Sequence, residues 1–146
     1  MISKEGAIRR FVREYDIQVP QALVEEEYHL CMMDMKHKMV YGQMAGSHQM
    51  NPMEQAEALK DAQEELMEVA YLSVKEDLVM KEVIEKGNFT VTQAELQQYA
   101  EELAKRQNTT MDMVKRFFGE DFALLVRDVK RQKAEAWIYQ QVTANM

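Results

Sequence analysis

The sequence predicts an all-α protein, and three observations lead to this fold class. Glycine and proline are rare, with five and two copies among 146 residues, whereas all-β chains need many tight turns. Apolar residues recur at intervals of three and four residues, as they do on one face of an amphipathic helix. Helix-start signals precede most of these stretches. With 47% hydrophobic and 29% charged residues, residues 1–146 are expected to form a single ordered domain.

The first two helices are separated by an extended segment that ends at Pro20. The first helix is expected over residues 3–15, with Ile8, Val12 and Tyr15 on its apolar stripe. Proline pushes the residue before it into extended geometry, yet it suits the first position of a helix. A second helix is therefore expected from Pro20 to about Gly46, since glycine is common just after helix C-termini.

The third helix is expected to be long, running from Pro52 to about Gly87. In "NPME", Asn51 can cap the helix and Glu54 can close a capping box. The apolar repeat that follows has these members: Leu59, Ala62, Leu66, Val69, Ser73, Met80 and Ile84. Asp77 falls on the same side, so it is expected to be paired or locally exposed.

Three further helices are expected in the C-terminal part. "TQAE" from Thr92 is a capping box that opens a fourth helix. Its inward residues are expected to be Leu96, Tyr99, Ala100 and Leu103. Thr109 or Thr110 can cap a short fifth helix that ends at Gly119. The last helix is expected from about Glu120 to Val142, because acidic residues are favourable at a helix N-terminus.

The charge distribution and the single cysteine restrict the partners and the compartment. A net charge of −7 argues against a nucleic-acid backbone or an anionic membrane as partner. Residues 54–103 carry thirteen acids and four lysines, whereas residues 104–146 carry eight bases and five acids, which is typical of solvated helix faces. One cysteine forms no intramolecular disulfide, and neither a signal peptide nor a membrane span is recognisable. A cytoplasmic protein is expected.

The sequence holds no recognisable catalytic constellation. It lacks a glycine-rich phosphate loop and the G-x-S-x-G, H-E-x-x-H and C-x-x-C motifs. Its many carboxylates are dispersed along helices, as surface charges are. We therefore expect a binding protein without a cofactor and not an enzyme.

The segment "HLCMMDMKHKMVYGQM", residues 29–44, raises the alternative of a soft-metal site. It contains two histidines, the only cysteine and five of the thirteen methionines. Such side chains bind Cu(I), but methionine also fills irregular apolar space. On a helix, His29 and Cys31 point about 200° apart, so they cannot readily share one ion. Met33 and His37 are one turn apart, but two ligands make a weak site, and no bound metal is expected.

The same helix carries two opposed apolar stripes instead of one. The inner stripe consists of Val24, Tyr28, Cys31, Met32, Met35 and Met39. The outer stripe consists of Leu30, Met33, Val40, Tyr41 and Met44, with Leu23 and His37 on the same side. A surface helix needs only one apolar stripe, so this helix is either sandwiched between layers or offers one stripe to a partner. We expect the inner stripe to be core, because Val24 and Tyr28 follow the Pro20 turn, where the neighbouring helix must pack.

Several segments together resemble the C-terminal, substrate-binding domain of bacterial trigger factor. "VPQALVEEEYHLCMMDM" is similar to the V-P-x-x-L-[IV] opening of a long helix in that family. "KEVIEKGNFTVTQAELQQYAEELAKRQN" resembles its helix–turn–helix, and "VKRFFGEDFALLVRDVKRQKAEAWIYQQV" resembles its closing short helix, break and long terminal helix. The resemblance covers most of the chain, from about residue 2 to residue 143.

The resemblance implies an elongated all-α fold with helical arms, shared with SurA-like chaperones, that binds unfolded or nascent polypeptides without ATP. The family's ribosome-docking signature G-F-R-x-G-x-x-P and its prolyl isomerase domain are not found in these 146 residues. Client binding is therefore expected, without ribosome docking or isomerase activity. The outer stripe is the expected peptide-binding surface. The main alternative is a homodimeric helical scaffold in which a second copy covers that stripe.

Overall fold

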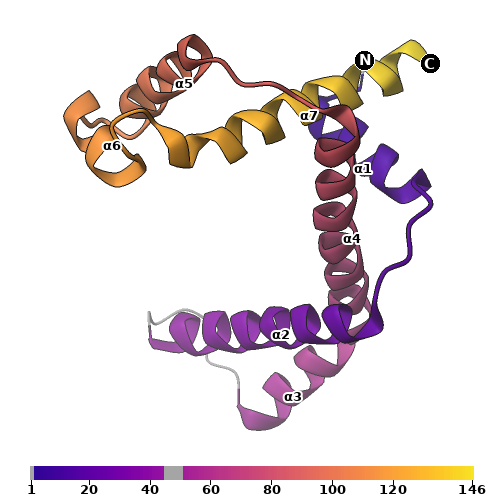
Figure 1. The fold of residues 1–146 in the computed structure, drawn as a ribbon. Coiled ribbons are helices and arrows are strands. Elements are labelled where there is room, and N and C mark those ends of the chain that lie inside the picture. The colour runs from indigo at the N-terminus through magenta and orange to yellow at the C-terminus, as the bar shows by residue number, and fades with distance from the viewer. Residues whose placement is uncertain (1, 45–50) are drawn as a thin grey trace. The chain divides into compact units, whose positions relative to one another are not determined.

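The computed structural model describes residues 2–44 and 51–146, and the side chains of residues 42–44 are outside that description. Within these ranges the chain is helical and contains no strand, which confirms the all-α class. The elements are α1 (Lys4–Glu14), α2 (Gln21–Met44), α3 (Pro52–Asp61), α4 (Gln63–Gly87), α5 (Gln93–Arg106), α6 (Met111–Phe118), the 3₁₀ helix η1 (Ala123–Leu125) and α7 (Val126–Ala144) (Figure 1). They form two compact units, of which one contains Val12–Val79 and the other contains Met1–Phe11 and Met80–Met146.

The Val12–Val79 unit has a small apolar core. In this unit α3 packs along α2 (Figure 1). Its buried apolar side chains are Val12, Val24, Ala70 and Val79. Most other apolar side chains of α2 and α3 are half-buried or exposed. This unit therefore leaves much of its apolar surface in contact with solvent.

Lys75 is the buried charged side chain of this unit, with only 7% of its surface exposed. Its Nζ donates a hydrogen bond of 3.1 Å to the carbonyl oxygen of Arg13, in the last turn of α1. The last carbonyls of a helix have no partner within the helix, and the helix dipole favours a cation at that end. The hydrogen bond to the Arg13 carbonyl, which has no acceptor role within α1, thus offsets part of the cost of burying the Lys75 ammonium group.

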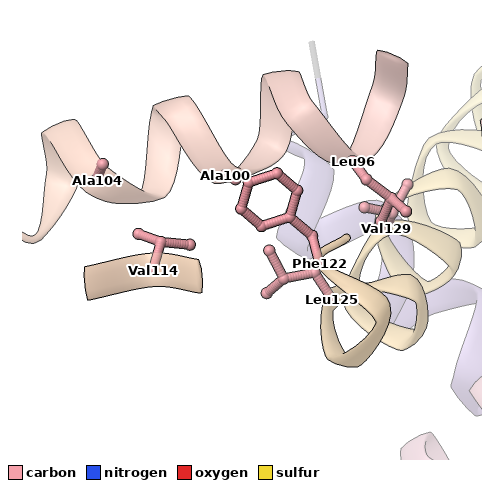
Figure 2. Close-up of a cluster of buried hydrophobic side chains, with 7 residues drawn as sticks. All are labelled: Leu96, Ala100, Ala104, Val114, Phe122, Leu125 and Val129. Atoms are coloured by element: carbon pink, nitrogen blue, oxygen red, sulfur yellow. The ribbon is translucent and has the colours of Figure 1, made fainter. Parts of the chain in front are cut away.

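The other unit contains the larger core, which is formed by α5, α6, η1 and α7. One cluster consists of Leu96, Ala100, Ala104, Val114, Phe122, Leu125 and Val129 (Figure 2). The small side chains of Ala100 and Ala104 lie on the inward side of α5, where they leave room for the neighbouring segments. The ring of Phe122 lies beside Ala100 in this view and is 1% exposed. Elsewhere in this unit, Phe11 of α1 contacts Trp137 of α7 edge to face, with ring centroids 5.9 Å apart.

The expected last helix begins later than the sequence suggests. Gly119 ends α6 with φ 98°, and Phe122 adopts a left-handed conformation with φ 59°. Asp121 lies before the first turn of α7, and its Oδ1 accepts a hydrogen bond from the backbone N–H of Ala123. The left-handed residue turns the chain so that the Phe122 ring enters the core. The helical stretch expected from Glu120 is therefore a turn followed by η1 and α7.

The expected long third helix is interrupted at Ala62, between α3 and α4. Ala62 has φ −83° and ψ −9°, so its ψ departs from the usual helical value of about −42°. The break changes which residues face inward along α4. Val69 is 48% exposed, contrary to the expected stripe, and Ala70 is fully buried instead. Asp77, expected to be either paired or exposed, is exposed.

The expected helix starts are largely confirmed. Asn51 Oδ1 accepts from the backbone N–H of Glu54 at 2.8 Å, and Thr110 Oγ1 accepts from Met113 at 3.3 Å. Thr92 and Glu95 form the reciprocal capping box at the start of α5. The first two helices begin and end within a residue or two of their expected positions, except that Gly46 lies outside the described residues.

The capping box of α5 leads to a prediction about acid stability. Glu95 forms an ion pair with Lys133, which also donates to the carbonyl oxygen of Thr90. The hydrogen bond from Lys133, helped by that from the Thr92 backbone, lowers the pKa of Glu95 below its usual 4.5. A lowered folded-state pKa stabilises the fold above the unfolded-state pKa, and this stabilisation is lost as the pH falls through the folded-state value.

We therefore expect urea unfolding to become easier as the pH falls below about 4.5, and the Glu95→Gln variant to show a smaller change over that range. Measurement by circular dichroism at several pH values tests this. Glu120→Gln, which removes a carboxylate outside the capping box, should retain the full dependence. Identical pH profiles for wild type and Glu95→Gln would contradict the role of the Glu95 carboxylate.

Candidate functional site

The outer stripe of α2 is exposed wherever the structure describes its side chains. The exposed fraction is 55% for Leu30, 65% for Met33, 50% for Val40 and 69% for Tyr41. Met44 is the last residue of α2, and its side chain lies outside the described residues. The period of the helix brings these residues to one side, because most successive members of the stripe are three or seven positions apart, which is about one or two turns.

The inner stripe is less exposed, but only part of it is core. Val24 is 3% exposed, whereas Tyr28, Met32, Met35 and Met39 are half-buried. The inner stripe is therefore the less exposed of the two, as expected. Of its residues, however, only Val24 is fully buried. The adjacent helix α3, which packs on α2, likewise has no buried residue.

Charged and polar residues separate the two stripes. Asp34 and Lys38 form an ion pair of 3.0 Å one turn apart on the exposed surface. Such exposed pairs contribute little to stability, but they keep the apolar stripes from merging. The outer stripe is thus a narrow apolar band with a charged border.

Cys31 belongs to the inner stripe and is half-buried. Burial raises the pKa of its thiol, and the nearby carboxylates of Glu27 and Asp34 raise it further. The thiol therefore stays protonated at neutral pH, whereas metal ligation and nucleophilic attack both require the thiolate. The surroundings of Cys31 favour a packing role.

These surroundings also bear on the metal alternative. Met33 and His37 are both exposed, and the described residues contain no group of three histidine, cysteine or acidic side chains placed to hold an ion. We expect protein purified under reducing conditions to contain no stoichiometric metal after dialysis against a mild chelator. Elemental analysis provides the measurement, and copper or zinc retained at one ion per chain would contradict this expectation.

A second apolar surface lies between α5 and α6, in the other unit. A depression of about 520 Å³, here called the α5–α6 groove, is lined chiefly by apolar side chains. Its apolar lining residues are Leu103, Met113, Val114, Phe117 and Phe118. Phe117 is 67% exposed and Met113 is 36% exposed, so part of the lining is directly accessible.

This groove is not predicted from the sequence, although the sequence contains a signal for it. In "MDMVKRFF", Met113 and Phe117 form a second apolar row beside the inward row that contains Val114 and Phe118. The second row indicates that α6 carries more apolar surface than its contact with the core buries. Whether that surface forms a groove depends on α5, which the local sequence does not reveal.

A third, smaller depression of about 420 Å³ lies between the start of α2 and the first half of α4. Its apolar side chains are Val24, Met67 and Tyr71, and the carboxylates of Glu64 and Glu68 border it. Met67 and Tyr71 are exposed, so this site extends the accessible apolar surface of the Val12–Val79 unit.

None of the described helices is both long enough and apolar enough to cross a membrane. The α2 helix has the length but carries charged residues along both borders of its stripes.

Comparison with known proteins assigns the family. Searches of curated proteins and of solved structures gave no significant match. The family model of the bacterial trigger factor C-terminus, however, matches residues 3–140. This range contains all the described residues of the outer stripe and the whole α5–α6 groove. The chain therefore belongs to the bacterial trigger factor C-terminal family.

Proposed function

We propose that this protein binds unfolded or nascent polypeptides without ATP, and that the outer stripe of α2 is its principal contact surface. The observation that carries the proposal is the exposure of Leu30, Met33, Val40 and Tyr41 on one side of a single helix. Contiguous exposed apolar surface is uncommon on proteins that act alone, and it marks sites of interaction. Membership of the trigger factor C-terminal family supports a chaperone-type role.

The dimensions of the stripe suit a short extended segment of a client. Leu30 and Tyr41 are eleven positions apart, which corresponds to about 16 Å along a helix. An extended chain covers that length with about five residues at roughly 3.3 Å each. Methionine side chains are flexible and polarizable, so they adapt to different apolar partners. Such a surface favours weak, reversible binding to many sequences.

The role proposed is binding and not catalysis. Among the described residues, most acids and both histidines are exposed and dispersed along the chain, and the one cysteine has a raised pKa. Ribosome docking and prolyl isomerisation are not proposed for this chain. The cytoplasm is the proposed location, since a single cysteine requires no oxidising compartment.

Suppression of client aggregation tests this proposal. A chemically denatured client protein is diluted into buffer with or without this protein, in the absence of ATP, and light scattering is recorded. We expect the scattering to fall as the concentration of this protein rises. Serum albumin at equal mass provides the control for nonspecific protection. No protection beyond that control would contradict the proposed function.

Sedimentation of the protein alone separates client binding from a dimeric scaffold. A scaffold would bury the outer stripe against a second copy, so it would sediment as a dimer and leave client aggregation unchanged. Client binding at the stripe predicts instead that the outer stripe is free in the protein alone, so the protein should sediment as a monomer and suppress client aggregation. A stable dimer without protection would favour the scaffold.

A further inference from the structure

Met33 is the methionine of the outer stripe whose side chain the structure describes, and it is 65% exposed. By contrast, Met32, Met35 and Met39 of the inner stripe are half-buried. A dissolved oxidant must reach the sulfur atom, so an exposed methionine reacts before one that its neighbours cover. Oxidation at a low dose is therefore expected at Met33 ahead of the inner stripe.

The thiol of Cys31, two positions before Met33, is a poor target for peroxide. Cys31 is half-buried, and burial raises the pKa of its thiol, as do the carboxylates of Glu27 and Asp34. Peroxides react with the thiolate, and a raised pKa keeps that form scarce at neutral pH. The thioether of Met33 needs no deprotonation, because the lone pair of its sulfur is the nucleophile.

The reaction of a methionine with hydrogen peroxide transfers one oxygen atom. The sulfur lone pair attacks one peroxide oxygen, so that an S–O bond forms and the O–O bond breaks. The departing oxygen takes the proton of the transferred oxygen and leaves as water, so the thioether is oxidised to a sulfoxide and the peroxide is reduced. Thiol-dependent methionine sulfoxide reductases reverse this change: two thiols are oxidised to a disulfide, and the sulfoxide oxygen leaves as water.

A sulfoxide at position 33 would make the outer stripe more polar. In the free protein, water donates hydrogen bonds to the added oxygen. An apolar client segment would displace that water without replacing its hydrogen bonds, which weakens binding. The fold depends little on the exposed side chain of Met33, so the same change should leave stability nearly unaltered.

On the basis of the proposed function, we propose that Met33 is a reversible oxidation site, at which peroxide weakens client binding by the outer stripe and a sulfoxide reductase restores it. Both the exposure of Met33 and its place in the stripe are needed for this role. Met53 of α3 is 75% exposed but lies outside the outer stripe. Its oxidation is therefore expected to leave client binding unchanged.

Peroxide treatment followed by mass spectrometry and light scattering tests this proposal. The protein is treated with hydrogen peroxide at a dose that leaves its melting temperature unchanged, the peroxide is removed, and the sulfoxide at each methionine is quantified. We expect Met33 and Met53 to be oxidised severalfold faster than Met35, while Cys31 stays reduced. Suppression of client aggregation should fall on the order of threefold relative to the untreated protein.

Matched variants, each compared with its own untreated form, assign the change to one sulfur atom. Met33→Leu keeps an apolar side chain without sulfur and should lose much less protection on treatment than wild type, whereas Met53→Leu should lose as much. Met33→Gln, whose amide imitates the sulfoxide, should protect less than wild type without any peroxide. Sulfoxide reductases of both stereochemical types, supplied with dithiothreitol, should restore the treated wild type. Dithiothreitol alone reduces oxidised cysteine but not the sulfoxide, so it should not restore protection.

The untreated protein separates failure of this oxidation switch from failure of the proposed function. If the untreated protein protects the client and Met33→Leu loses as much protection on treatment as wild type, the switch at Met33 is wrong while client binding stands. The same conclusion follows if protection is unchanged when Met33 is fully oxidised, or if dithiothreitol alone restores it. If the untreated protein gives no protection, the proposed function is contradicted, and the switch fails with it.

Discussion

Replacing Phe122 with alanine is expected to lower the free energy of unfolding by about 3–5 kcal/mol, the range usual for buried aromatic truncations. The Phe122 ring is 1% exposed and lies in the core cluster with residues from α5, α6 and α7. Its removal would leave a cavity that the backbone of the surrounding helices cannot easily close. Urea denaturation followed by circular dichroism measures the loss.

Two further variants separate the contribution of the Phe122 ring to stability from that of its backbone conformation. Phe122 has a positive φ, which costs an L-residue about 1–2 kcal/mol and costs glycine much less. Phe122→Gly is therefore expected to be no less stable than Phe122→Ala. Leu124→Ala, in the same segment but 67% exposed, should change the stability by less than about 0.5 kcal/mol. Equal losses for Phe122→Ala and Leu124→Ala would contradict this account of the core.

The second large effect is expected on client binding. Met33→Ser/Tyr41→Ser changes two exposed side chains of the outer stripe, so the melting temperature should remain nearly unchanged. Suppression of client aggregation should fall severalfold, because the variant removes two of the largest apolar contacts of the stripe. Light scattering and thermal unfolding are measured on the same preparations.

The inner stripe provides the matched control. Met32→Ser/Met35→Ser also removes two large apolar side chains from α2, but these are half-buried. This variant is expected to lose about 1–3 kcal/mol of stability. At temperatures where it remains folded, it should suppress aggregation nearly as well as wild type. If both variants destabilise equally, α2 is a core element on both sides, and the proposed binding surface is wrong.

The sequence predicts the helices well because their signals are local. Asn51, Thr92 and Thr110 each cap a helix through a hydrogen bond to a backbone group three residues away. Such contacts depend on a few consecutive residues and scarcely on the rest of the protein. The same holds for the two stripes of α2, which a helical wheel separates, and the place of Val24 next to the Pro20 turn indicates which of them faces inward.

The sequence does not predict features that depend on packing between helices. No glycine or proline marks the break at Ala62, and nothing near Phe122 indicates a left-handed conformation for an aromatic residue. That conformation is stabilised by burial of the Phe122 ring among residues distant in the sequence. The half-burial of Met32 and the α5–α6 groove likewise depend on how closely a neighbouring helix approaches.

The most direct test of the central claim is photo-crosslinking from the outer stripe. A photoreactive phenylalanine derivative is placed at Met33, or at Glu25 as an exposed control in the charged border beside the stripe, and the protein is irradiated with a denatured client. Binding through the outer stripe predicts a client adduct from position 33 that is much stronger than the adduct from position 25. Adducts only to a second copy of this protein, or equal adducts from both positions, would contradict the claim that the outer stripe of α2 binds clients.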